Sequence, residues 1–226
     1  MYGEEMAEKE KESKIIKEKD REVLQKQFKQ LENPVDLVFF TQERECQFCR
    51  ETHQVLEEVA ALSEAITLTV YDFVNDADSV SRYSIDKIPA LAVIGNSIDY
   101  GIRFFGIPGG YEFTPLVIDI LTSSKGSSLL QQSTRDSLKE LHEDVHIQVL
   151  TTPTCPYCSQ AVQTAHQIAI ESERVRADMV GAVEFPHLAH KYDVFAVPKI
   201  VINETHHVEG VIPEPQFVKE IMTALR

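Results

Sequence analysis

Four cysteines carry the reactive chemistry of this 226-residue chain, and the sequence contains no others. They form two Cys-x-x-Cys pairs, Cys46 with Cys49 and Cys155 with Cys158. Residues three apart at the start of a helix lie roughly 5–6 Å from each other, which suits the Cα separation of a disulfide. Each pair can therefore open and close with little movement of the backbone, as dithiol–disulfide exchange requires.

The two cysteines of a pair are expected to have different roles. The first lies at the start of a predicted helix, where free N–H groups and the helix dipole stabilise a thiolate. The second is in phase with the apolar residues of that helix and should be covered. We therefore expect exposed Cys46 and Cys155 to attack a substrate disulfide, and buried Cys49 and Cys158 to resolve the mixed disulfide.

A proline follows each cysteine pair at a constant interval. Pro89 lies 43 residues after the first cysteine of its half, and Pro198 lies 43 residues after the first cysteine of the second half. The residue before each proline is apolar, Ile88 in one half and Val197 in the other. Because the whole pattern recurs at an offset of 109 residues, the sequence indicates two copies of one structural unit.

The apolar spacing predicts the same elements in both halves, a helix followed by β-α-β-α-β-β-α. Residues 1–13 are polar and are expected to fray, and the polar run 122–128 is predicted to be a linker. In the first half we expect helices near 15–31, 49–63, 76–83 and 113–122 and strands near 35–41, 66–74, 90–94 and 102–107. In the second half we expect helices near 129–142, 158–172, 184–192 and 215–225, strands near 146–151 and 174–180, and a hairpin over 199–211.

Composition narrows the class of protein. A net charge of −14 argues against nucleic acid or an anionic membrane surface as the main partner. The sequence has no apolar run of signal-peptide or transmembrane length, so we expect a cytoplasmic protein without a membrane partner. Cytoplasmic thiols are usually reduced, and a Cys-x-x-Cys pair there is more often catalytic or metal-binding than structural.

Three other interpretations of these residues fit the sequence less well than disulfide exchange: a zinc site, permanent disulfides and a histidine metal site. Zinc sites of four cysteines commonly place about 15–20 residues between the two pairs, whereas 105 residues separate these pairs. Permanent disulfides would close loops too short to add much stability. His187 with His190, or His206 with His207, could bind a metal, but no cysteine or carboxylate cluster accompanies them in the sequence and surface positions are more common.

The surroundings of the two cysteine pairs differ in charge. Two glutamates and an arginine, residues 43–45, precede Cys46, whereas residues 152–154 before Cys155 are neutral. Neighbouring carboxylates disfavour a thiolate. Pro156 also occupies the favoured first position of a helix. We therefore predict that Cys155 has the lower pKa and that the C-terminal site is the more active.

Each half resembles a thioredoxin-fold domain, in which a strand, Cys-x-x-Cys, a helix and a proline opening a β-hairpin follow in this order. The tandem has the sequence CQFC first, CPYC second and the run FFGIP at 104–108. In this it resembles the protein disulfide oxidoreductases of thermophilic microbes, which are protein disulfide isomerase-like and related to glutaredoxins. The resemblance covers about residues 14–226. It implies an α/β fold of two tandem thioredoxin-fold units, 1–124 and 125–226, each a central mixed sheet flanked by helices.

The resemblance also assigns the prolines. It implies that Pro89 and Pro198 are cis and face the dithiols, and that Ile88 and Val197 offer backbone hydrogen bonds to a bound peptide.

The chain departs from typical thioredoxins at two points. It has no tryptophan, whereas thioredoxins carry one before the first cysteine. Phe40 and Val149 stand where thioredoxins have a buried aspartate, six residues before the first cysteine. The usual acceptor for the proton of the resolving cysteine is therefore missing.

These observations predict a cytoplasmic oxidoreductase that reduces, forms or isomerises protein disulfides through mixed disulfides. It would need no metal or organic cofactor beyond its cysteine pairs. Its partners would be protein substrates with disulfides or thiols, and a thioredoxin reductase-like flavoprotein. Two alternatives remain open: a dedicated electron carrier from a flavoprotein reductase to a peroxidase, and a non-enzymatic zinc-binding interaction module.

Overall fold

A computed structural model describes residues 14–226, and the predicted frayed start at 1–13 lies outside the described residues. Within 14–226, no helix combines the length and the apolar character needed to cross a membrane. The first half contains α2 (Glu18–Phe28), β1 (Val35–Thr41), α3 (Cys49–Ala60), β2 (Ile66–Asp72), α4 (Ala77–Arg82), β3 (Ala90–Gly95), β4 (Ile98–Phe105), η1 (Gly110–Glu112) and α5 (Phe113–Lys125). The second half contains α6 (Gln132–Leu138), β5 (Val145–Thr151), α7 (Cys158–Glu171), β6 (Val175–Gly181), α8 (Pro186–Lys191), β7 (Lys199–Ile202), β8 (His206–Glu209) and α9 (Glu214–Ala224).

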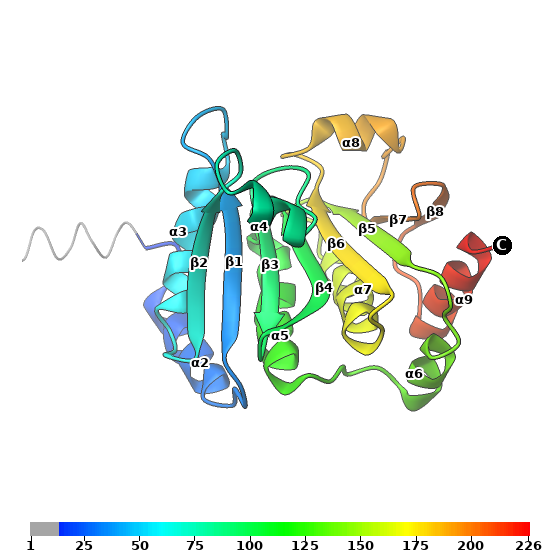
Figure 1. Ribbon diagram of the computed structural model, residues 1–226, viewed down its shortest axis with the longest axis horizontal. Coiled ribbons are helices and arrows are strands. Elements are labelled where there is room, and N and C mark those ends of the chain that lie inside the picture. The colour runs from blue at the N-terminus through cyan, green and yellow to red at the C-terminus, as the bar shows by residue number, and fades with distance from the viewer. Residues whose placement is uncertain (1–13) are drawn as a thin grey trace, which may run out of the picture.

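The strands of both halves form one sheet in the order β2-β1-β3-β4-β6-β5-β7-β8 (Figure 1). Each half contributes four strands in the same internal order, a parallel pair followed by an antiparallel hairpin. The halves meet where Ile102–Phe105 of β4 pair in parallel with Ala177–Val180 of β6. The predicted α/β class and the mixed sheet flanked by helices are confirmed. The structure adds that the sheets of the two halves are continuous.

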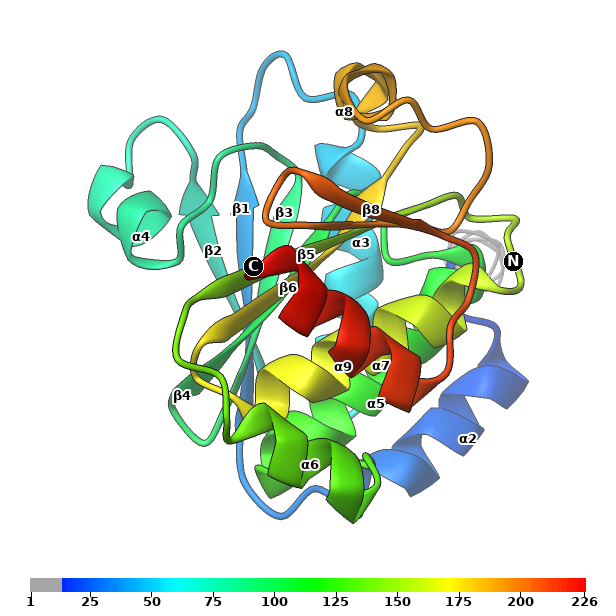
Figure 2. The same cartoon turned by 90° about the vertical axis from the view of Figure 1, so that its right-hand side faces the viewer.

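Alternating residues of each strand pack on opposite faces of this sheet. Leu37 and Phe39 join the core beneath helices α3, α5 and α7, whereas Val38 and Phe40 join a smaller cluster with Tyr83. This period of two follows from the pleat of a strand. Figure 2 shows α4 on the side of the sheet away from α5 and α7. The helices that carry Cys49 and Cys158 therefore lie together on the more heavily covered face.

The predicted linker 122–128 is wrong for its first four residues, because α5 continues to Lys125 and ends at Gly126. The boundary predicted between 124 and 125 thus falls in the last turn of a helix. Ser124 is buried there, and its hydroxyl accepts hydrogen bonds from the N–H groups of Glu32 and Asn33 at 2.9 Å. Serine is common in linkers, and nothing in the local sequence reveals that these hydroxyls satisfy backbone groups of a distant turn.

Buried polar contacts fix the two halves to each other. Asp119 of α5 and His166 of α7 are both completely buried and lie 2.6 Å apart, and His166 also meets the ring of Phe104 edge-on. The amide of Gln167 donates to the hydroxyl of Thr122 across the same pair of helices. Because breaking such a buried pair leaves a group without a partner, these contacts hold the halves as one body.

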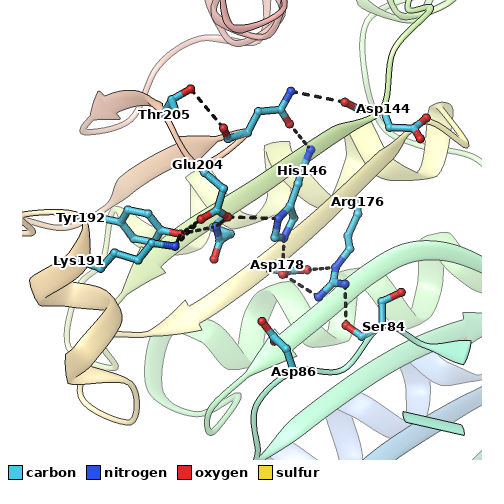
Figure 3. Close-up of polar contacts among 12 residues, drawn as sticks. Ser84, Asp86, Asp144, His146, Arg176, Asp178, Lys191, Tyr192, Glu204 and Thr205 are labelled. Carbon is cyan, nitrogen blue, oxygen red and sulfur yellow. Dashed lines mark hydrogen bonds and ion pairs between the residues drawn. The ribbon is translucent and has the colours of Figure 1, made fainter. Parts of the chain in front are cut away.

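A second polar network links the halves on the other face of the sheet (Figure 3). Asp178 in β6 is completely buried and accepts from Arg176 at 2.8 Å, and His146 lies 2.7 Å from its other oxygen. Arg176 also donates to the carbonyl of Ser84 in the first half. Burial raises the pKa of Asp178, but the hydrogen bond to His146 and the charge of Arg176 outweigh it and hold the pKa at about 2.

This network predicts how stability responds to acid. A carboxyl whose folded pKa is depressed stabilises the fold above its unfolded pKa and loses that contribution as the pH falls through its folded value. Asp178→Asn should therefore lower the free energy of unfolding at pH 7 by roughly 2 kcal/mol and flatten its decline between pH 4 and 2. Urea unfolding across this pH range measures both effects. The exposed Asp78, which lies outside this network, provides the control Asp78→Asn, which should leave the pH profile nearly unchanged.

Candidate active site

Both cysteine pairs lie where a strand passes into a helix. Cys46 and Cys49 form a disulfide between β1 and the first residue of α3, and Cys155 and Cys158 form one between β5 and the first residue of α7. The Cα atoms are 5.5 Å apart in each pair, as the spacing of three residues predicts. Both dithiols therefore sit at helix N-termini, where the helix dipole favours a thiolate.

Solvent exposure differs between the two first cysteines. Cys49 and Cys158 are buried, at 3% and 0% exposure, as predicted for the second member of each pair. Cys46 is half-buried, but Cys155 is only 7% exposed, so the prediction that it is exposed is wrong. Its sulfur lies 3.7 Å from the carbonyl oxygen of Val197 and accepts the N–H of Cys158 at 3.1 Å. Backbone of the proline loop thus covers a sulfur that the sequence places at an open helix end.

Both predicted cis peptide bonds are present, Ile88–Pro89 and Val197–Pro198. Each proline is buried, whereas Ile88 and Val197 are half-buried. The contact between the Val197 carbonyl and Cys155 brings the second half's proline loop against its dithiol. A peptide bound beside this sulfur would meet backbone groups of Val197.

The sheet directs both dithiols to the same edge. Strand β1 is antiparallel to β3, β3 is antiparallel to β4, and β4, β6 and β5 are mutually parallel, so β1 and β5 run in the same direction. Four strand intervals separate β1 from β5. At about 4.8 Å an interval, the strands that lead into the two sites lie roughly 19 Å apart. The two pairs of sulfurs are therefore too far apart in this arrangement to exchange with each other directly.

The loop before the first cysteine is one residue longer in the first half. Residues 42–45 separate β1 from Cys46, whereas residues 152–154 separate β5 from Cys155. The extra residue is accommodated by Glu45, which adopts a positive φ of 56°. The longer loop accompanies the greater exposure of Cys46. The offset of 109 between the cysteines does not reveal this difference, because the offset between the strands before them is 110.

Sequence reasoning missed a buried carboxyl beside the C-terminal site. Glu112 in η1 is 1% exposed, and neither of its carboxyl oxygens has a hydrogen-bond partner within 14–226. Burial raises its pKa to about 7; its own backbone N–H and the Thr151 hydroxyl lie near enough to lower the pKa without forming a hydrogen bond of good geometry, and the charge of Glu184 raises it further. Thr151 is the last residue of β5, and η1 contacts α7, the helix that begins at Cys158. A carboxyl whose pKa is about 7 therefore lies in a turn that contacts the helix beginning at Cys158.

Two glycines of the first half bring Glu112 to this place. Gly110 has a φ of +60°, and a Cβ there would lie 2.3 Å from the carbonyl oxygen of Pro153. The next residue, Tyr111, donates its N–H to the same carbonyl at 3.2 Å. The Gly-Gly sequence at 109–110 was the available signal, since glycine permits such close approach. The sequence does not show which backbone it approaches.

The histidines named above as possible metal ligands contact residues other than the cysteines. His206 in β8 lies 2.7 Å from Glu220 of α9, and His207 packs edge-on against Tyr192. His187 packs against Phe185. Among residues 14–226, no group of three or more His, Cys, Asp or Glu side chains is arranged to hold a metal ion. The described histidine contacts are those of packing and ion pairing.

Comparisons with known proteins point to the same chemistry. A family model for the thioredoxin domain matches residues 145–223. A crystal structure of a protein disulfide oxidoreductase from Aeropyrum pernix is 31% identical, with a TM-score of 0.86 over 92% of this chain and 93% of that one. A crystal structure of a domain of the alkylhydroperoxide reductase AhpF from Enterococcus faecalis is 25% identical, with a TM-score of 0.84 over 90% of this chain and 98% of that one.

Curated relatives extend beyond this chain. A protein named NADH dehydrogenase from Ferdinandcohnia aciditolerans is 25% identical over 171 residues, which are 76% of this chain and 30% of that one. The chain spans about a third of the length of the curated relatives that it matches first. The similarity therefore covers one part of these longer proteins.

The raised pKa of Glu112 predicts an effect on stability. A carboxyl that is harder to ionise in the folded state binds more protons there, so stability falls as the pH rises from its unfolded pKa of 4.5 to about 7. In the oxidised protein, Glu112→Gln should be as stable as the wild type at pH 4 and more stable at pH 8, by up to about 3 kcal/mol. Denaturant unfolding at both pH values measures this difference. The exposed Glu51 offers the control Glu51→Gln; an equal gain in that variant would contradict the assignment.

Proposed function

Because the chain belongs to the thioredoxin-fold disulfide oxidoreductases, we propose that it reduces, forms or isomerises disulfides in protein substrates with its two dithiols. The observation that carries this proposal is the C-terminal site. There a disulfide at a helix N-terminus lies beside the carbonyl that precedes a cis proline, with Cys155 3.7 Å from that oxygen. A substrate that pairs with the backbone of the proline loop would be held beside this nearly buried sulfur.

In the reductive direction the first cysteine begins the reaction. The thiolate of Cys155 attacks one sulfur of a substrate disulfide, forms a mixed disulfide and expels the other substrate sulfur as a thiolate, which takes a proton from water. Cys158 loses its proton and attacks the sulfur of Cys155. The mixed disulfide breaks, the Cys155–Cys158 bond closes, and two electrons have passed to the substrate. Cys46 and Cys49 take the same roles in the first half.

Glu112 is the acceptor that we assign to the proton of Cys158. A general base works best when its pKa lies near the working pH. The pKa of Glu112, about 7, meets this requirement, and its turn contacts both the loop before Cys155 and the helix that begins at Cys158. The residue comes from the first half of the chain. It takes the place of the aspartate that Val149 replaces at the C-terminal site.

The two sites act separately on a substrate. The separation of roughly 19 Å between the strands that lead into them excludes direct transfer of a disulfide from one dithiol to the other in this arrangement. Isomerisation must therefore proceed within one mixed disulfide, or on a substrate long enough to reach both sites. Both dithiols face one edge of the sheet, so a single polypeptide could engage them in turn.

We also propose the cofactor requirement, the reductase partner and the cellular location of this reaction. The cysteine pairs carry the electrons, and the protein needs no metal or organic cofactor of its own. A thioredoxin reductase-like flavoprotein would return the oxidised pairs to dithiols. The protein would work in the cytoplasm, where a reducing thiol pool supports this direction.

A second candidate is an electron carrier between a flavoprotein reductase and a peroxidase. The similarity to the alkylhydroperoxide reductase AhpF over 90% of the chain favours it. The chemistry at the dithiols would be the same, and only the partner would differ. Reduction of a peroxidase disulfide that outpaces reduction of scrambled ribonuclease or insulin would favour the carrier over the general oxidoreductase.

Reduction of insulin in the presence of dithiothreitol tests the proposal and the predicted inequality of the sites. The wild type should exceed the rate of dithiothreitol alone. Cys155→Ser should remove most of that excess, because the neutral loop before Cys155 favours its thiolate more than the acidic loop favours that of Cys46. Cys46→Ser should remove the smaller part. Turbidity from the released insulin B chain follows the rate.

The double variant Cys46→Ser/Cys155→Ser is the control for both single variants and should show the rate of dithiothreitol alone. Loss confined to Cys46→Ser would keep the chemistry and reverse the ranking of the sites. A wild type without any excess rate would contradict the proposal. Metal content and a count of free thiols would then test the zinc-binding alternative.

A further inference from the structure

The loops that lead into the two dithiols differ in charge, since residues 43–45 are all charged and residues 152–154 are all neutral. Glu43, Arg44 and Glu45 line a cleft of about 650 Å³ beside Cys46, together with Asp72 at the end of β2. All three loop residues are exposed. Three carboxylates and one guanidinium therefore line a cleft formed in part by the loop that leads into Cys46.

Backbone hydrogen bonds hold the carboxylate of Asp72 in place beside this cleft. Asp72 accepts the N–H groups of Val74 at 2.9 Å and Asn75 at 2.8 Å, and Asp76 accepts the N–H of Asp72 at 2.7 Å. These bonds use one oxygen of each carboxylate and fix the turn that follows β2. The negative charge of Asp72 is thus positioned by the backbone.

The C-terminal site lacks every one of these charges. Residues 152–154 are Thr-Pro-Thr, and the positions 109 residues after Asp72 and Asp76 are Gly181 and Phe185. The carboxylate of Glu184, in the same turn, points inward and accepts the N–H of Ile107. Two exposed aromatic residues lie in this half, with Tyr157 68% and Phe195 92% exposed.

The separation of the two dithiol sites keeps the electrostatic field at one site from reaching the other. The strands that lead into the sites lie roughly 19 Å apart, more than twice the Debye length of about 8 Å at physiological ionic strength. Charges at the mouth of one site therefore act on partners of that site and are screened from the other. A cleft lined by one sign of charge raises the encounter rate of the opposite sign.

We propose that Glu43, Glu45 and Asp72 make the N-terminal dithiol selective for cationic disulfide partners, such as a protein segment whose cysteine is flanked by Lys or Arg. The C-terminal dithiol accepts partners with little regard to charge. This inference rests on the proposed function, because it concerns the choice of substrate for the same exchange. The Cys46 thiolate attacks the cationic disulfide and expels one substrate thiolate. Cys49 then closes the Cys46–Cys49 bond and releases the second, so two electrons reach the substrate.

Single-site proteins allow each dithiol to be measured alone. Cys155→Ser/Cys158→Ser leaves the N-terminal site, and Cys46→Ser/Cys49→Ser leaves the C-terminal site. The reduced proteins react with three small disulfides: cystamine, which carries two ammonium groups, neutral bis(2-hydroxyethyl) disulfide, and dianionic 3,3′-dithiodipropionate. Quenched flow and mass spectrometry count the closed protein disulfide. Comparing the ratio of rates between the two sites cancels the intrinsic reactivity of each probe.

We expect the N-terminal site to prefer cystamine over the dianion roughly tenfold more than the C-terminal site does at low salt. That excess should collapse toward one at about 0.5 M salt. Glu43→Gln/Glu45→Gln should abolish the excess. Glutamine keeps the size of the side chain at Glu45, where a β-branched residue would be strained by the positive φ. The reciprocal change Thr152→Glu/Thr154→Glu should give the C-terminal site a preference for cystamine.

The neutral probe separates this inference from the proposed function. Reduction of the neutral disulfide by both sites, with equal charge preferences at low salt, overturns the inference and leaves the oxidoreductase in place. A preference for cystamine that survives high salt or the Glu43→Gln/Glu45→Gln change also overturns it. Failure of both single-site proteins to reduce the neutral disulfide overturns the proposed function and this inference together.

Discussion

The parallel pairing of β4 with β6 is the constraint on which the rest of the structure depends. It joins two four-stranded sheets into one and gives β1 and β5 the same direction. Both dithiols consequently open at one edge, at a separation fixed by four strand intervals. The same junction brings η1 of the first half, and with it Glu112, against α7 and the loop before Cys155 in the other repeat. A flexible linker between independent domains would fix neither relation.

The two dithiols also differ in their surroundings. The first half of the chain supplies η1 and the buried carboxyl of Glu112 to the surroundings of the C-terminal dithiol. The loop at 152–154 that leads into this dithiol is neutral. The N-terminal dithiol has a loop longer by one residue, a half-buried first cysteine and an acidic mouth. One repeated arrangement of strand, cysteines and proline thus supports two different environments. Differences in pKa, access and partner charge follow from what surrounds each copy.

The sequence was sufficient to predict the features that the two halves share. Apolar periodicity predicted the element order, and the constant interval from cysteine to proline predicted which segments meet, because both signals are local or periodic. The cis peptide bonds followed from the family resemblance. Contacts between the halves could not be predicted in this way. The pair of Asp119 with His166, and the turn at 110–112 with the loop before Cys155, join residues that have no periodic relation and whose types are common in exposed positions.

The error at Cys155 shows where helix periodicity stops being informative. Phase along a helix correctly placed Cys158 in the core, since that residue is part of α7. Cys155 precedes the helix, and its cover comes from the carbonyl of Val197, 42 residues away. A sulfur covered by backbone yet next to a helix N-terminus meets two opposing effects on its thiolate, desolvation and the helix dipole. Burial alone would favour Cys46 as the stronger nucleophile, and charge alone would favour Cys155. The higher activity predicted for the C-terminal site therefore requires that the neutral loop at 152–154 outweighs the burial of the Cys155 sulfur.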